Sequence, residues 1–189
     1  RYRMELGGDP EHTLTELNTL CADQQHDLAC AEIIRIADEQ QAQPDWLVLL
    51  TAHRHRCERT PRRCQELGVM LAMGQGVPRD LPEAYRHFVS ACDAGVLHGC
   101  VNAGMAALSE GFSTPEEAAA LWDRACEGNH AEGCLRLGGL YYSGTAVSHD
   151  PGQSHAYLQR ACDLGLREGC ENLQILCELP YEPACSDGE

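Results

Sequence analysis

Residues 84–105 decide the fold, and they read AYRHFVSACDAGVLHGCVNAGM. Apolar residues at helical spacing run up to Cys92, a turn containing glycine follows, and a second helix is predicted to begin near Cys100. The same phrase returns at residues 125–134 and 161–170, and its leading cysteine recurs after 34 and then 36 residues. A period of this length built from two helices is typical of an α-solenoid, in which each repeat contacts only its neighbours.

The composition excludes several classes of function. The net charge is −15, whereas nucleic-acid binding needs a positively charged surface, so we expect no nucleic-acid partner. All 14 basic residues are arginine, and the lack of lysine excludes a Walker-type phosphate loop, a Ser-x-x-Lys nucleophile and a Schiff-base lysine. No stretch approaches the roughly 18 consecutive apolar residues of a membrane span, so we expect no direct membrane insertion.

The twelve cysteines form six local pairs. An even count at repeating spacing favours disulfides, each joining the end of one repeat's second helix to the start of the next repeat's first helix. Buried free thiols and metal ligation are the alternatives. Tetrahedral metal sites usually use cysteines closer together in a tight turn, so we expect no metal and no cofactor. The predicted bridges are Cys21–Cys30, Cys57–Cys64, Cys92–Cys100, Cys126–Cys134, Cys162–Cys170 and Cys177–Cys185.

Helical periodicity, prolines at first turns and glycines at breaks predict an all-α chain. Residues 1–56 read as a degenerate capping repeat, 57–177 as about three and a half regular repeats, and 178–189 as a tail held by the last cysteine pair, all in one continuous solenoid. The predicted helices span residues 10–21, 30–41, 45–57, 60–73, 82–92, 100–108, 113–126, 134–142, 153–162 and 170–179.

Three sets of equivalent positions indicate how the helices pack. A large apolar residue stands four before the leading cysteine, a small residue stands eight before it, and a glycine stands four after the second cysteine. Glycine inside a helix costs about 1 kcal/mol relative to alanine, so its recurrence indicates close helix approach. The positions are Phe88, Trp122 and Leu158; Ala84, Ala118 and Ser154; and Gly68, Gly104 and Gly138.

These residues resemble Sel1-like repeats, relatives of the tetratricopeptide repeat. The first helix carries Leu-Gly at Leu67 and at Leu137, and the second follows the pattern Ala-x-x-x-aromatic-x-x-Ala at residues 84–91 and 118–125. The junction Ala-Cys-x-x-Gly-x-x-x-Gly-Cys is similar to the secreted, cysteine-rich branch of the Helicobacter cysteine-rich proteins. The resemblance implies an α/α superhelical solenoid with one disulfide per repeat, which binds proteins or peptides on its concave side.

No group of side chains in the sequence has the spacing of a catalytic site. His53 and His55 lie two residues apart, so on a helix they point in different directions. A peptide-binding row is predicted on the concave wall formed by the first helices, where Asn102, Arg136 and Asn172 each follow a junction cysteine by two residues. Tyr141 and Tyr142 complete this row.

A second candidate site is a cluster of arginines around one predicted turn. It is either a solvated corner between helices or a docking site for an acidic or phosphate-bearing partner. Its members are Arg54, Arg56, Arg59, Arg62 and Arg63.

The main hypothesis is a non-enzymatic, monomeric scaffold or adaptor that binds another protein or an extended peptide. Because disulfides persist in oxidising compartments, we expect a periplasmic or secreted protein; the first nine residues lack the apolar core of a signal peptide, so we expect targeting information to lie outside this sequence. The resemblance implies two alternatives. One is a penicillin-binding protein with weak β-lactamase activity, and the other is an assembly factor of the mitochondrial intermembrane space.

Overall fold

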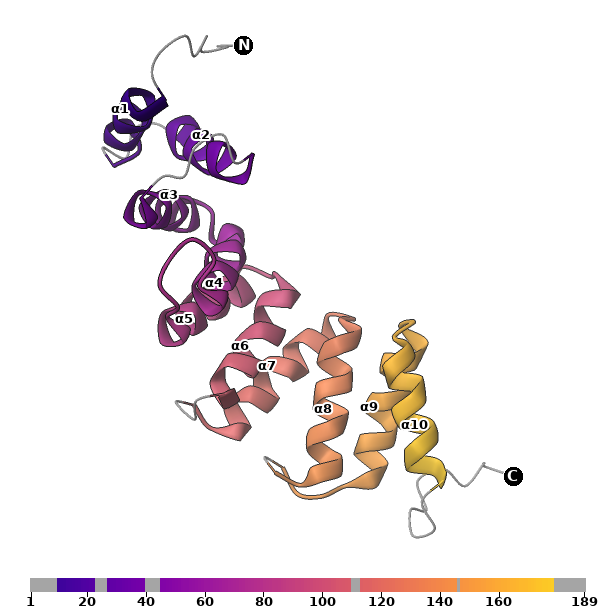
Figure 1. Cartoon of the computed structure of the whole chain (residues 1–189). Coiled ribbons are helices and arrows are strands. Elements are labelled where there is room, and N and C mark those ends of the chain that lie inside the picture. Colours follow the sequence, from indigo (N-terminus) through magenta and orange to yellow (C-terminus); the bar gives the residue numbers. More distant parts are fainter. Residues whose placement is uncertain (1–9, 23–26, 40–44, 110–112, 146, 179–189) are drawn as a thin grey trace. The chain divides into compact units, whose positions relative to one another are not determined.

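The computed structural model describes residues 10–22, 27–39, 45–109, 113–145 and 147–178. The chain divides into two compact units, residues 1–90 and 91–189, each described below by itself. In the described part of the chain every regular element is a helix, which confirms the all-α prediction (Figure 1).

The first unit contains five α-helices and one short 3₁₀-helix, η1, among its described residues. Consecutive helices pack on one another from α1 to α4, with η1 leading into α4. The helix α5 runs to the end of this unit, and its last turn, from Ala91, belongs to the second. The elements are α1 (Pro10–Ala22), α2 (Asp27–Asp38), α3 (Trp46–Arg59), η1 (Pro61–Arg63), α4 (Cys64–Met73) and α5 (Leu81–Asp93).

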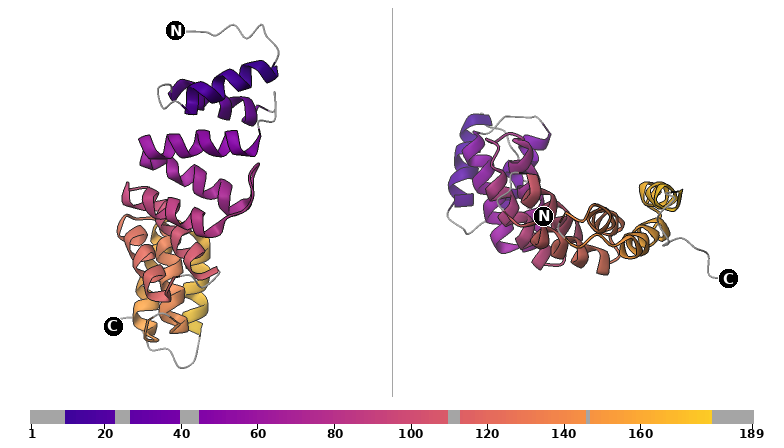
Figure 2. Two further views of the ribbon diagram at one scale, coloured as in Figure 1. Left: turned by 90° about the vertical axis from the view of Figure 1, so that its left-hand side faces the viewer. Right: turned by 90° about the horizontal axis from the view of Figure 1, so that it is seen from below.

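The second unit contains five further helices in its described residues. Each contacts the next along the chain, and α8 also contacts both α6 and α10. Figure 2 shows α8, α9 and α10 side by side at the end of this series. This pattern of contacts between sequence neighbours confirms the solenoid prediction. The helices are α6 (Leu97–Ser109), α7 (Pro115–Glu127), α8 (Ala131–Ser143), α9 (Pro151–Asp163) and α10 (Arg167–Glu178).

The close helix approach predicted at the recurring glycines is confirmed in both units, and each glycine lies against a large side chain. A Cβ atom added at Gly68 would lie 2.5 Å from the ring of Phe88, and one added at Gly104 would lie 2.4 Å from the indole of Trp122. At Gly138 the distance to Leu158 would be 2.9 Å. Real Cβ atoms do not approach side chains this closely, so only glycine lets these helices meet.

Five of the six predicted cysteine pairs are disulfides in the structure. They join Cys21–Cys30, Cys57–Cys64, Cys92–Cys100, Cys126–Cys134 and Cys162–Cys170. The sixth pair contains Cys185, which lies outside the described residues. Of the tail predicted at residues 178–189, Glu178 is the last residue of α10, and residues 179–189 also lie outside the described part. In each bridge the two Cα atoms are between 4.5 and 4.9 Å apart, which is within the range of ordinary disulfides.

The helices that follow the junction turns begin earlier than predicted. They start at Leu97, Ala131 and Arg167, three residues before the cysteine that was expected to open each helix. The reason is a left-handed residue that closes the preceding helix, at Gly95, Asn129 and Gly165. Asn129 has a φ of 65° and is, among the described residues, the one non-glycine with positive φ; asparagine tolerates this region better than most residues. The chain therefore re-enters the helix almost at once.

Capping confirms the predicted start of α7. The hydroxyl of Thr114 accepts a hydrogen bond from the backbone N–H of Glu117, and the Glu117 carboxylate accepts one from the backbone N–H of Thr114. This reciprocal pair satisfies two of the free N–H groups at the helix end. The helix α9 starts in a similar way, with Asp150 as its cap and Pro151 in its first turn, which is slightly earlier than the predicted start at Gln153.

Candidate functional site

The predicted peptide-binding row lies on α6, α8 and α10 of the second unit. These three helices are the first helices of successive repeats, and α8 contacts the other two. The structure brings only part of the row together. Tyr142 and Asn172 line one pocket, whereas Asn102, Arg136 and Tyr141 do not.

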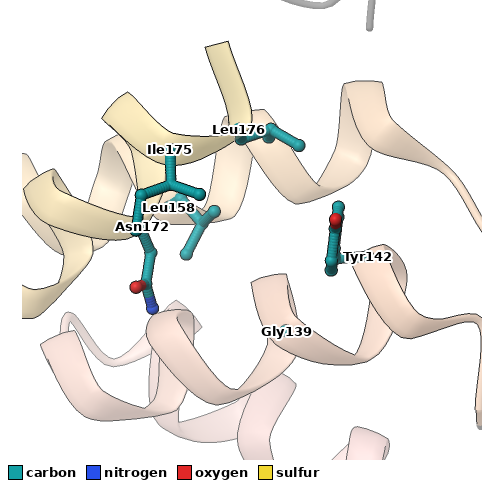
Figure 3. A pocket seen from close by; sticks show the side chains of 6 residues that line it. All are labelled: Gly139, Tyr142, Leu158, Asn172, Ile175 and Leu176. Atoms are coloured by element: carbon teal, nitrogen blue, oxygen red, sulfur yellow. The ribbon is translucent and has the colours of Figure 1, made fainter. Parts of the chain in front are cut away.

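The pocket has a volume of about 230 Å³ and lies between α8, α9 and α10 (Figure 3). Leu158 and Leu176 are its buried residues, with 4% and 2% of their surfaces exposed. Tyr142 and Ile175 are exposed by 46% and 59%, and they face the cavity from two different helices in Figure 3. The result is an apolar cavity with apolar side chains at its mouth.

One side-chain amide and one glycine also line this pocket. The side chain of Asn172 carries an amide that can both donate and accept hydrogen bonds, and it lines the pocket opposite α8. Gly139 lines it from α8, and a Cβ at this position would meet nothing within 4 Å. The equivalent residues of the two preceding repeats are Val69 and Met105, so the missing side chain at Gly139 leaves open space here.

Tyr141 has a structural role next to this pocket. Its ring stacks on that of Tyr157 from α9, with centroids 5.5 Å apart and planes within 12°. The Tyr157 hydroxyl donates to Asp123 on α7 at 3.5 Å. Burial, followed by the nearby Asp123 carboxylate, raises the pKa of Tyr157, so this phenol stays protonated at neutral pH. The stack therefore connects α8 with α9, and the hydrogen bond to Asp123 adds α7.

The other two members of the predicted row lie away from the pocket. Arg136 forms an ion pair with Glu132 one turn earlier on α8, at 2.9 Å, and both side chains are exposed. Exposed pairs of this kind contribute little to stability, so Arg136 remains available to a partner. Asn102 is half-buried on α6. Their participation in binding stays a prediction.

Members of the arginine cluster form ion pairs with nearby glutamates. Arg54 on α3 donates two hydrogen bonds to Glu83 on α5, at 3.0 and 2.6 Å. Arg63 in η1 pairs with Glu66 on α4 at 2.6 Å. Arg59 and Arg62 are exposed and Arg56 is half-buried. The guanidinium groups of Arg54 and Arg63 are thus neutralised locally, and docking of an acidic partner at the cluster stays a prediction.

Two histidines meet at the start of the first helices of neighbouring repeats. The rings of His98 on α6 and His130 before α8 pack edge to face, with centroids 4.3 Å apart. Nδ1 of His130 is buried without a hydrogen-bond partner among the described residues. Burial first, and then the positive charge that His98 can carry, lowers the pKa of His130, while Glu132 opposes this shift.

Stability is therefore expected to fall as the pH is lowered from about 7.5 to 5.5. Unfolded His130 takes up a proton near its ordinary pKa of about 6.5, whereas folded His130 does so only at a lower pH, so the unfolded state binds more protons in this window. Urea unfolding at several pH values checks this. His130→Gln cannot titrate, and its stability should decline less steeply over the same range; parallel curves for both proteins would contradict the assignment.

Comparison with known proteins identifies the family to which this fold belongs. The sequence model of the family described as "Sel1 repeat" matches residues 64–96, 104–130 and 131–166. The chain belongs to the Sel1 repeat family. Each matched segment covers one turn-connected pair of helices or most of one, in agreement with the repeat read from the sequence. This family is not defined by a catalytic activity.

Two solved structures share the Sel1 fold. A Sel1 repeat protein from Oxalobacter formigenes superposes with a TM-score of 0.68 at 16% identity, covering 95% of this chain and 74% of that one. Helicobacter pylori cysteine rich protein B superposes with a TM-score of 0.51 at 22% identity, covering 66% of this chain and 96% of that one. At such low identity the likeness concerns the fold alone.

Curated relatives are more similar in sequence. One of them is the Xenopus tropicalis protein named cytochrome c oxidase assembly factor 7, which is 29% identical over 61% of this chain and 54% of its own length. The chain therefore spans about half the length of that relative. Within the described residues, no helix has the combination of length and apolar character that crossing a bilayer requires.

Sequence reasoning missed four of the six residues that line the pocket. Leu158 was assigned only to the core, and Gly139, Ile175 and Leu176 were not considered. Two signals could have indicated them. Gly139 replaces the larger residues of the preceding Sel1 repeats, and Ile175, in the equivalent place of the next repeat, is a large aliphatic residue facing the space that Gly139 leaves.

Proposed function

We propose that this chain is a protein-interaction scaffold, whose pocket between α8, α9 and α10 accepts one apolar side chain of an extended partner segment. The observation that carries the proposal is the size and lining of the cavity. Its volume of about 230 Å³ lies below the roughly 300–1,000 Å³ of sites that enclose a drug-sized ligand. It has room for a single large side chain.

The surroundings of the pocket support a peptide as the ligand. The Asn172 amide can pair with both the N–H and the C=O of a peptide backbone beside the cavity. Tyr142 offers a rigid, amphipathic ring of the kind that is enriched in protein interfaces. The net charge of −15 favours approach of a positively charged segment over an acidic one.

Gly139→Met tests this proposal because it should fill the pocket without harming the fold. Methionine is the residue at the equivalent place of the preceding repeat, a Cβ at Gly139 meets nothing within 4 Å, and replacing a helical glycine favours the helix. Peptides selected from a random library on the wild-type protein should contain a large apolar residue. Their affinity for Gly139→Met should drop at least about tenfold, equivalent to about 1.4 kcal/mol.

Ala120→Met is the matched control, since it places the same side chain at an exposed position of α7 away from the pocket. Selected peptides should bind it within about twofold of wild type, and neither variant should lower the free energy of unfolding by more than about 0.5 kcal/mol. Binding retained in Gly139→Met, or lost equally in both variants, would reject the pocket.

The compartment and the biological partner are part of the same proposal. Five buried or half-buried disulfides favour an oxidising compartment, either outside the cytoplasmic membrane or in the mitochondrial intermembrane space. The likeness to cytochrome c oxidase assembly factor 7 favours a second candidate function, assembly of cytochrome c oxidase. The penicillin-binding alternative has no structural observation in its favour, and the chain has no lysine for a Ser-x-x-Lys pair.

A pull-down with purified subunits of cytochrome c oxidase separates the general scaffold from the assembly factor. The assembly hypothesis expects one subunit to bind wild type and to bind Gly139→Met more weakly. Peptide binding without capture of any subunit would support the scaffold and reject the assembly role.

A further inference from the structure

The disulfide between Cys57 and Cys64 has a histidine against it. Cys57 lies in the last turn of α3, Cys64 begins α4, and His87 reaches them from α5. Nδ1 of His87 lies 3.5 Å from the Sγ of Cys57. The two sulfurs and a ring nitrogen of His87 all lie within 4.8 Å of one another, so three potential metal donors from three helices converge on one point.

A carboxylate holds this histidine in a fixed orientation. Nε2 of His87 lies 3.4 Å from Oε1 of Glu83, one turn earlier on α5, and Glu83 is held in turn by Arg54 at 2.6 Å. Donation of the Nε2 proton to Glu83 leaves the lone pair of Nδ1 directed at the sulfurs. A histidine that binds a metal through one nitrogen usually donates its other N–H to such an acceptor.

The equivalent positions of the other repeats carry no such ligand. His87 stands five residues before a leading cysteine, and the same place is occupied by Leu121 and by Tyr157 in the next two repeats. Leu121 is buried, and Tyr157 donates to Asp123. The fold therefore requires only a large side chain here, and a histidine with an oriented free nitrogen is particular to the Cys57–Cys64 junction.

We propose that Cys57, Cys64 and His87 bind a Zn²⁺ ion when the Cys57–Cys64 bond is reduced. Reduction by a dithiol, which becomes a disulfide itself, supplies two electrons and two protons and yields two thiols; binding of Zn²⁺ then releases both thiol protons. Zn–S bonds of about 2.3 Å and Zn–N bonds of about 2.0 Å at tetrahedral angles place sulfur and nitrogen about 3.5 Å apart. This matches the separation of 3.5 Å between Cys57 Sγ and His87 Nδ1.

The zinc-bound and disulfide states exclude each other because both use the same two sulfurs. Zinc would join α3, α4 and α5 in the reduced chain, and its release would accompany oxidation to the bond seen here. Exchange of this disulfide with another protein is disfavoured, since Cys57 and Cys64 are only 5% and 1% exposed and exchange needs access to a sulfur atom. The expectation of no metal considered cysteine spacing alone, which could not indicate a third ligand from α5.

The test follows reoxidation of the fully reduced protein by oxidised glutathione, with Zn²⁺ or with EDTA. Free thiols are alkylated at intervals, and peptide mass spectrometry measures each disulfide separately. Zinc should slow formation of Cys57–Cys64 by on the order of tenfold, because thiolates bound to the ion are withheld from the oxidant. Formation of Cys126–Cys134 in the same sample should change less than about twofold, since among the described residues no third metal donor lies with that pair.

His87→Leu, which introduces the residue found at position 121, should abolish the effect of zinc on Cys57–Cys64. Glu83→Gln keeps all three ligands and should weaken zinc binding about 10–100-fold, measured by competition with a chromophoric chelator. Equal slowing of both disulfides by zinc, no slowing of either, or unchanged slowing in His87→Leu would each overturn the proposal.

Discussion

Trp122→Ala is expected to lower the free energy of unfolding by about 3–5 kcal/mol, the usual effect of removing a buried tryptophan. The indole is 5% exposed and lies against the bare backbone of Gly104, which has no side chain to move into the space it leaves. Its Nε1–H also donates to the carbonyl of Val101 at 3.1 Å, and this hydrogen bond would be lost as well. Urea unfolding followed by far-ultraviolet circular dichroism measures the change.

Two variants separate the contributions to this effect. Trp122→Phe keeps a ring against Gly104 but loses the hydrogen bond. The loss of this bond should lower the free energy of unfolding by about 1 kcal/mol, in addition to the effect of the smaller side chain. Trp46→Ala removes the other tryptophan, which is 47% exposed, and should change stability by less than about 1 kcal/mol. Equal losses in Trp122→Ala and Trp46→Ala would contradict the packing described for α6 and α7.

The double variant Cys126→Ala/Cys134→Ala should be destabilised by at least about 2.5 kcal/mol, the chain-entropy value for a closed loop of about nine residues. Both sulfurs are fully buried, with 0% of either cysteine exposed, so lost packing adds to the loss of loop constraint. Unfolding in urea without reductant measures the change.

Cys162→Ala/Cys170→Ala provides a matched comparison. Its bridge has the same sequence separation of 8 and the same Cα–Cα distance of 4.6 Å, but its cysteines are half-buried. The entropic loss should be the same and the packing loss smaller, so this variant should be the more stable of the two. The reverse order would show that burial of the sulfurs does not add to the effect of the crosslink.

The repeating core could be predicted because the same local constraint recurs in each repeat. The glycines at 68, 104 and 138 and the large residues at 88, 122 and 158 stand at constant distances from the cysteines, so one copy explains the others. The starts of α6, α8 and α10 were harder to predict from the sequence. They depend on left-handed residues at 95, 129 and 165. The residue at 129 is an asparagine, so the glycine that usually marks such a turn is missing there.

The candidate sites depend on departures from the repeat, which is why sequence reasoning found only part of them. Tyr142 and Asn172 were predicted from their positions, but the pocket itself exists because Gly139 lacks a side chain that its equivalents have. His87 was unremarked because its partners come from α3 and α4, far away in sequence. A pattern common to all repeats predicts the framework, whereas the exceptional residue in one repeat indicates a site.

The position of the bridges also has a consequence for proteolysis. The exposed turn residues Gly128 and Asn129 are accessible points for cleavage, and they lie between Cys126 and Cys134, which are bonded to each other. A single cut there would leave both fragments covalently attached, and the packing of α7 on α8 would keep the new ends close. Nicked chains would migrate as intact protein on a gel until a reductant is added. A cut in the turn would therefore not by itself detach the partner-binding surface from the rest of the chain.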